Sequence, residues 1–124
     1  ATVRQRFDEQ LAAQLDSDAT HAGVVAAVRS AFERRLQARR MHTQAQSETR
    51  SATAMLRGVR AERKVGERST FDEIRAIENL TSAETNLNSA RFELRAAEYT
   101  LAAETGLIAR LFDDSAQSVA LATK

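Results

Sequence analysis

The chain contains no proline and no cysteine, and only four of its 124 residues are glycine. Proline and glycine are the residues that most disfavour a helix interior, so little in this sequence limits the length of a helix. Without cysteine, the chain forms no disulfide and has no thiolate chemistry. Aromatic residues make up only 5% of the chain, which leaves few side chains able to fill a compact core. We therefore expect an all-α protein built from long helices.

Charge and hydropathy exclude further classes. Charged residues make up 28% of the chain, but the net charge is only +1, which gives no overall attraction to nucleic acid or to anionic membrane. No apolar run approaches the roughly 20 residues that a membrane-spanning helix needs. The first residues do not resemble a signal peptide, so we expect a mature region or an excised piece.

A strict seven-residue repeat runs through the second half of the chain. Leucine and alanine alternate at steps of three and four residues, in two series: Leu80, Leu87, Leu94 and Leu101, and Ala76, Ala83, Ala90 and Ala97. This pattern places leucine at each a position and alanine at each d position of a helix that lies along another helix. Alanine at every second position lets the two backbones approach closely.

The first half of the chain predicts the other helix. Apolar residues at helical spacing fall in two stretches and resume before residue 64: Val3, Phe7, Leu11 and Leu15; Val24, Val25, Val28, Phe32 and Leu36; and Met55, Leu56 and Val59. A helix from about residue 3 to 64 would be roughly 90 Å long at 1.5 Å per residue. Between Gln37 and Ala54, Met41 is the only large apolar side chain. This polar middle predicts a helix with water on both sides.

Residues 65–69 predict a tight turn between the two helices. Gly66 is suited to the left-handed conformation that closes a helix, and Arg63 and Lys64 complement the helix dipole just before it. Two overlapping capping boxes, Ser69-x-x-Asp72 and Thr70-x-x-Glu73, are candidates to start the next helix. That helix should run to about Thr105.

The predicted fold is a single domain over 1–124, a long antiparallel α-helical hairpin of coiled-coil type. It consists of a helix over about 3–64, a tip turn over 65–69 and a helix over about 70–105. Gly106 is a second stop signal, followed by a short helical or frayed tail over 107–124. A two-helix hairpin has one thin seam, so we expect it to need partners for stability.

Three features in order resemble the TolC family of outer-membrane efflux and secretion channels. They are Val65-Gly66-Glu67-Arg68-Ser69-Thr70-Phe71-Asp72-Glu73-Ile74, the Leu/Ala repeat that follows, and Glu104-Thr105-Gly106-Leu107. Upstream, Val24-Val25-Ala26-Ala27-Val28-Arg29-Ser30-Ala31-Phe32 is similar to the preceding long helix of that family. The resemblance covers most of the chain, from about Val24 to Phe112.

The resemblance implies a fragment of a trimeric channel subunit, the periplasmic helical part of its second repeat. In that family, helical hairpins form a periplasmic α-barrel, and the hairpin tips meet a periplasmic adaptor protein that connects the channel to an inner-membrane pump. Val65, Gly66 and Glu67 occupy the adaptor-binding tip here. The channel is passive, serves drug efflux or type I protein secretion, and has no cofactor.

The resemblance also implies gate candidates, Arg68 and Asp72, because polar residues just after the turn help to close the periplasmic end in that family. An exposed i,i+4 ion pair, worth about 0.3–0.5 kcal/mol, is an equally good interpretation of these two residues. The sequence departs from the family pattern at Arg63, where tyrosine is frequent, and at Arg75, where a second acidic residue often follows.

The sequence has no segments of alternating hydrophobicity that would form the strands of a membrane barrel. It also has no first copy of the helical repeat and no signal sequence. We therefore expect an excised, soluble periplasmic portion of an outer-membrane protein. Such a fragment could dimerise through its seam or open at Gly66 into one domain-swapped helix. The alternative function is an antiparallel coiled-coil scaffold with no channel role, which the Leu/Ala repeat supports equally well.

The other candidate residues are explained by ordinary structural roles. The arginines of Arg34-Arg35-Leu36-Gln37-Ala38-Arg39-Arg40 spread around the helix, which favours a solvated surface over nucleic-acid binding. His21 and His42 have no neighbours at metal-ligand spacing. The pairs Asp72-Glu73 and Asp113-Asp114 are explained by helix ends. We therefore predict no catalytic residue, no metal site and no enzyme activity.

Overall fold

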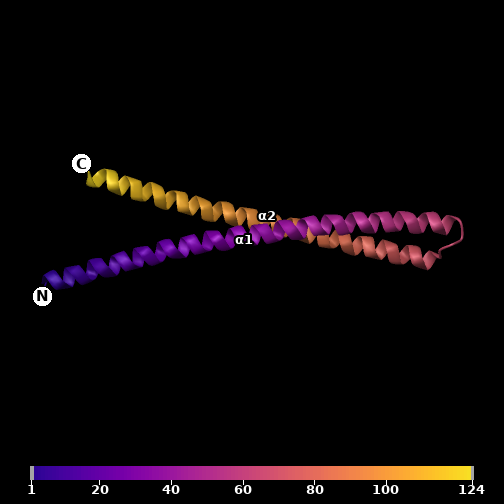
Figure 1. The fold of residues 1–124 in the computed structure, drawn as a ribbon, viewed down its shortest axis with the longest axis horizontal. Coiled ribbons are helices and arrows are strands. Elements are labelled where there is room, and N and C mark those ends of the chain that lie inside the picture. Colours follow the sequence, from indigo (N-terminus) through magenta and orange to yellow (C-terminus); the bar gives the residue numbers. More distant parts are fainter. Residues whose placement is uncertain (1, 124) are drawn as a thin grey trace. The chain divides into compact units, whose positions relative to one another are not determined.

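The computed structural model describes residues 2–123, apart from the side chain of Leu111. Two helices, α1 (Thr2–Lys64) and α2 (Thr70–Ala122), are joined by one turn (Figure 1). No strand occurs within residues 2–123. The predicted all-α helical hairpin is therefore confirmed. Ala1 and Lys124, which the predicted domain includes, lie outside the described residues.

The predicted end of the second helix near Thr105 is wrong. α2 continues through Gly106 to Ala122, so the predicted short or frayed tail is part of the same helix. Within residues 2–123 the one glycine with positive φ is Gly66. A glycine in a helix interior costs about 1 kcal/mol relative to alanine but does not end the helix by itself. Gly106 therefore lowers the helix propensity at this position but does not end α2.

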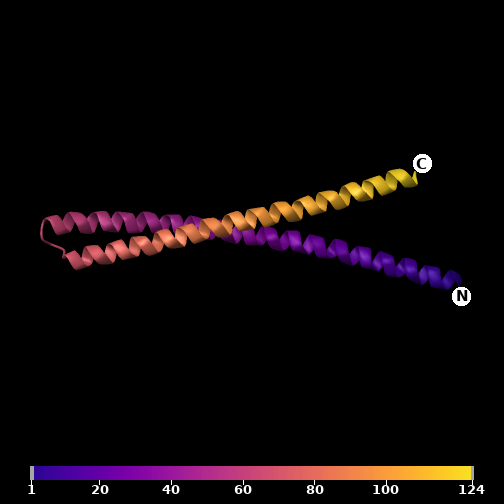
Figure 2. The same ribbon diagram turned by 180° about the vertical axis from the view of Figure 1, so that it is seen from behind.

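Residue contacts divide the chain into two units. One unit is Arg34–Glu98 and contains the turn; the other contains the residues up to Glu33 and those from Tyr99 onward. In the unit Arg34–Glu98, the two helical segments lie side by side and antiparallel, as Figures 1 and 2 both show. The organisation as a single domain stays a prediction.

The seam between the helices of the unit Arg34–Glu98 follows the predicted repeat on α2. The alanine series is buried or half-buried, and the leucine series is half-buried because only one partner helix covers it: Ala76, Ala83, Ala90 and Ala97, and Leu80, Leu87 and Leu94. The side chains deepest in this seam are thus the smallest. This is the packing expected where two helix backbones approach closely.

The middle of α1 differs from its prediction as a helix with water on both sides. Ala38 and Ala45 are buried and Ala52 is half-buried, each seven residues from the next, and Val59 continues the series as a buried residue. α1 therefore has its own alanine repeat, which a search for large apolar residues does not reveal. Leu56 and Val59 are buried as predicted, whereas Met55 is exposed.

One hydrogen bond across the seam indicates how close the backbones are. The hydroxyl of Thr49 lies 2.8 Å from the carbonyl oxygen of Ala45 in its own helix and 3.3 Å from that of Ala83 in α2. A threonine side chain is short, so it reaches a main-chain carbonyl of the opposite helix only where alanine keeps the helices together. Nearer the turn, Leu56, Val59 and Ala76 form the hydrophobic core with Leu80 packed against it.

The other unit is also helical, but its large apolar side chains are mostly exposed. Ala31 is buried, and Val24 and Val28 are half-buried. The other large apolar residues that recur at helical spacing in α1 up to Phe32 are exposed: Val3, Phe7, Leu11, Leu15, Val25 and Phe32. Leu36, which belongs to the unit Arg34–Glu98, is exposed as well. Within the unit Arg34–Glu98, the alanines of α1 lie in the seam in place of Leu36.

We predict that Ala83→Leu lowers the free energy of unfolding by about 1–3 kcal/mol, because the larger side chain forces the two helices apart. Chemical denaturation followed by circular dichroism would measure this change. Thr85→Leu is the matched control, since Thr85 is exposed on the same helix and should change stability by no more than about 0.5 kcal/mol. Equal effects of both substitutions would contradict the close-packed seam.

Candidate functional site at the turn

The end of α1 is closed by two main-chain hydrogen bonds of the Schellman type. The amide of Gly66 donates to the carbonyl of Arg63 at 3.0 Å, and the amide of Glu67 donates to the carbonyl of Glu62 at 2.9 Å. This arrangement requires a left-handed residue between them, and Gly66 has φ of 81°. Glycine adopts this conformation without steric cost.

The turn presents the three predicted tip residues to solvent. Val65 is 72% exposed, and Gly66 and Glu67 are exposed as well. An apolar side chain with this exposure buries little area and contributes little to the stability of the hairpin. Val65 is therefore available for contact with another molecule.

A capping box starts α2 at Ser69. The amide of Asp72 donates to the Ser69 hydroxyl at 3.3 Å, and the amide of Ser69 donates to Oδ2 of Asp72 at 3.1 Å. The hydrogen bonds from Ser69 lower the pKa of Asp72, and the nearby Arg68 and Arg75 act in the same direction. The other predicted box, which begins at Thr70, does not form because Glu73 bonds to α1 instead.

The gate candidates Arg68 and Asp72 have different partners in the structure. Arg68 Nε donates to Glu62 Oε2 at 2.6 Å, an ion pair that links the turn back to α1. This hydrogen bond raises the pKa of Arg68. Arg68 precedes the first residue of α2, so the helical i,i+4 spacing assumed for this pair does not apply. The gate role itself stays a prediction.

A cluster of three residues that sequence reasoning missed lies beside the turn. The carboxylate of Glu73 pairs with the guanidinium groups of Arg60, at 3.2 Å, and Arg63. The Glu73 side chain is only 14% exposed, and the hydrogen bond from Arg63 lowers its pKa. We call these residues the Glu73 cluster. Glu73 lies seven residues before Leu80, and this position in the leucine series was the available signal that it faces α1.

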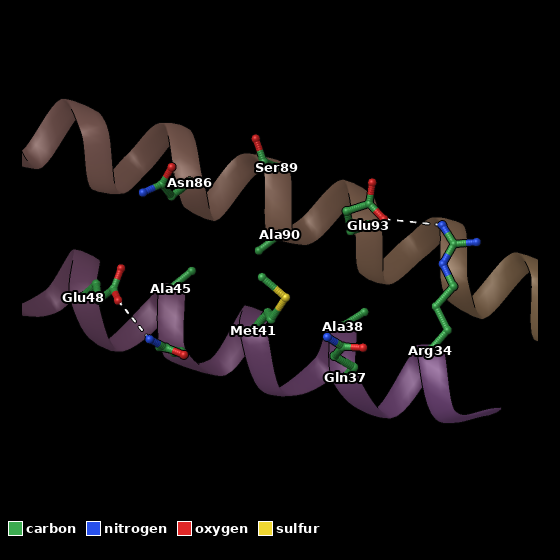
Figure 3. A pocket seen from close by; sticks show the side chains of 11 residues that line it. Arg34, Gln37, Ala38, Met41, Ala45, Glu48, Asn86, Ser89, Ala90 and Glu93 are labelled. Carbon is green, nitrogen blue, oxygen red and sulfur yellow. Dashed lines mark hydrogen bonds and ion pairs between the residues drawn. The ribbon is translucent and has the colours of Figure 1, made fainter. Parts of the chain in front are cut away.

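Farther from the turn, an open groove of about 500 Å³ lies beside Met41 (Figure 3). Its floor is made of Ala38, Ala45 and Ala90, and the Met41 side chain points across it toward Ala90. Arg34 of α1 pairs with Glu93 of α2 at 3.4 Å at one end of the groove. The charged groups of the groove are bonded within the hairpin, since Arg34 pairs with Glu93 and Glu48 accepts a hydrogen bond from Gln44.

The histidines and the Asp113-Asp114 pair lie within the helices. Within the described residues no three of His, Cys, Asp and Glu come together at a site for a metal ion. His21 is exposed and His42 is half-buried in the seam. Asp113 and Asp114 lie inside α2, so their interpretation as helix-end residues is wrong. No helix among residues 2–123 is long and apolar enough to cross a bilayer.

No family model, no curated protein and no solved structure matches this chain.

We predict that Gly66→Ala lowers the free energy of unfolding by about 1–2 kcal/mol, because alanine is strained at positive φ. Gly58→Ala is the matched control. An added Cβ at Gly58 meets nothing within 4 Å, and the position is helical, so this change should stabilise the protein by about 1 kcal/mol. Thermal and chemical denaturation would measure both. A stabilising Gly66→Ala would show that the turn is not closed as described.

We predict that the hairpin loses stability in acid. The pKa of Glu73 is lower in the folded protein than in the unfolded chain, so the stabilisation is present above the unfolded value of about 4.3 and is lost as the pH falls through the folded value. Denaturant midpoints between about pH 6 and pH 3 would measure it. Glu73→Gln should flatten this dependence more than Glu78→Gln, which lies outside the Glu73 cluster. Parallel pH profiles for the two variants would contradict the prediction.

Proposed function

We propose that this chain is a periplasmic α-barrel segment of a trimeric, TolC-like outer-membrane channel, used in drug efflux or type I protein secretion. The observation that carries the proposal is the position of the Val65-Gly66-Glu67 motif at the exposed turn of a two-helix hairpin. The same residues carry the family resemblance of the sequence. The proposal therefore rests on that resemblance together with the hairpin.

The packing of the hairpin supports this proposal. A wall of a helical barrel needs helices that contact a neighbour on each side. In the unit Arg34–Glu98, one side of each helix is used by the Ala/Leu seam, while Phe71, Ile74 and Phe92 remain 48–71% exposed on α2. Exposed apolar side chains of this size are typical of surfaces that bind another protein.

Under this proposal the hairpin has a passive role in transport. The tip residues Val65, Gly66 and Glu67 dock a periplasmic adaptor, and the adaptor links the channel to the inner-membrane pump that supplies the energy. Arg68 and Asp72 would contribute to closing the periplasmic end. Arg68 already pairs within the hairpin, so such a gate would have to break the contact with Glu62 or use it.

The second candidate function is an antiparallel coiled-coil scaffold without a channel. The continuous seam of alanine and leucine favours it, because that seam is complete within one chain. The two functions differ at the turn. A scaffold uses its helical sides, whereas a channel hairpin uses its exposed tip to bind the adaptor.

We predict that a photo-crosslinker at Glu67 captures a periplasmic adaptor when the channel subunit that carries this hairpin is expressed with its pump system. Glu67 is exposed and adjacent to Val65, so a docked adaptor would lie within reach. The crosslinked product is identified by mass spectrometry. The same crosslinker at Thr85, which is exposed but remote from the turn, is the control and should capture little adaptor.

Two results would remove the channel proposal. One is the absence of adaptor capture from both Val65 and Glu67 in cells where the adaptor is present. The other is a parent gene that encodes only this hairpin, with no second copy of it and no signal peptide.

A further inference from the structure

Five basic residues of α1 that lie away from the seam make no ion pair within the part of the chain that the structure describes. Between Arg34 and Lys64, nine residues are basic and two are acidic. Four of the basic residues pair with glutamates of α2, namely Arg34, Arg35, Arg60 and Arg63. The other five are exposed and make no ion pair within the described residues; we call them the basic face: Arg39, Arg40, Arg50, Arg57 and Lys64.

The basic face points away from the seam. Arg50, Arg57 and Lys64 each follow a seam position of the alanine series by five residues, which is about 140° around the helix. The two acidic residues of this stretch lie on the other flank of α1, where Glu48 bonds to Gln44 and Glu62 to Arg68. No carboxylate of α1 between Arg34 and Lys64 therefore neutralises the basic face. The row of Arg50, Arg57 and Lys64 lies outside the stretch from Arg34 to Arg40, whose arginines spread around the helix.

The spacing of the basic face is that of a helix–helix contact. Arg50, Arg57 and Lys64 recur every seven residues, so their charges repeat about every 10.5 Å along the axis. A second helix with acidic residues at the same seven-residue spacing would meet each of them in register. A nucleic-acid backbone winds away from a straight row of charges, and this face has no aromatic side chain on which a base could stack.

The surface beside these charges is flat enough for a close contact. Exposed small residues follow each other at steps of three and four along α1: Ser47, Ser51, Ala54, Gly58 and Ala61. An added Cβ at Gly58 would meet nothing within 4 Å. Near the other end, a shallow hollow is lined by Leu36, Arg39, Arg40, Thr43, Gln44 and Ser47. An incoming helix can therefore bring its carboxylates to the arginines without displacing side chains of this hairpin.

We propose that the basic face of α1 is a docking surface for an acidic amphipathic helix of another protein, bound along α1 with its carboxylates in seven-residue register. Charge complementarity and the seven-residue spacing along α1 support this partner, and the tip residues are not involved. The inference thus goes beyond the proposed function, because it assigns a partner to the side of the hairpin and holds for a channel segment and for a scaffold alike.

The test uses the full 124-residue chain and two synthetic helical peptides of about four heptads. Both peptides have the same composition, but one carries its glutamates at seven-residue spacing and the other has them distributed around the helix. Fluorescence anisotropy at low and at physiological salt would measure the dissociation constants. We expect the heptad peptide to bind at least about tenfold more tightly than the distributed one, and more weakly as salt increases.

Variants separate a docked helix from simple charge attraction. Arg50→Glu with Arg57→Glu should weaken binding of the heptad peptide at least about tenfold. The matched control, Arg91→Glu with Arg95→Glu, changes the net charge equally on exposed positions of α2 and should have little effect. Gly58→Leu keeps every charge but blocks close approach, so it should also weaken the heptad peptide. Circular dichroism confirms that each variant remains helical.

Three outcomes would overturn the proposal. The first is equal affinity for the two peptides, or tighter binding of duplex DNA than of the heptad peptide, either of which would indicate a general polyanion surface. The second is an undiminished affinity in the Arg50→Glu, Arg57→Glu variant. The third is self-association of the chain that the same variant abolishes, which would assign the basic face to a second copy.

Discussion

The close approach of two helix backbones is the constraint on which the hairpin depends. Alanine occupies buried positions of both helices, and the hydroxyl of Thr49 reaches a main-chain carbonyl of α2 at 3.3 Å. Small side chains bury little apolar area each, so the stability of such a seam comes from many well-packed contacts over its length. Larger apolar residues, such as Phe71 and Phe92, lie outside the seam and remain exposed to solvent.

The turn completes the hairpin with its own hydrogen bonds. Residues 65–69 join the two helices, and the Schellman bonds around Gly66 and the capping box of Ser69 and Asp72 bond the main chain there. Several polar atoms of the turn are thus bonded inside the hairpin, and Val65 is left as an exposed apolar side chain. Along the sides, α2 pairs with only some of the basic residues of α1, so the two flanks of α1 differ strongly in charge.

Much of the fold could be predicted because it depends on spacing along the chain. The Leu/Ala series of α2, the turn at Gly66 and the start of α2 at Thr70 all follow from local patterns, and the structure agrees with them. Two predictions failed for physical reasons. The polar middle of α1 suggested a helix with water on both sides, but Ala38 and Ala45 are small enough to be buried in the seam. Gly106 has the residue type of a helix stop, but α2 keeps it helical.

The sequence by itself determined that this chain forms two long helices with a glycine turn, since helix propensity, heptad spacing and capping act between near neighbours. Only the tertiary structure decided which charges are used within the hairpin. Glu73 reaches back to Arg60 and Arg63, and Arg68 turns to Glu62 and not to Asp72. The pairs of Glu73 join residues of different helices, and their partners depend on the relative rotation of α1 and α2 within the unit Arg34–Glu98. That rotation is fixed by the packing of the alanine seam and is not a property of either helix alone.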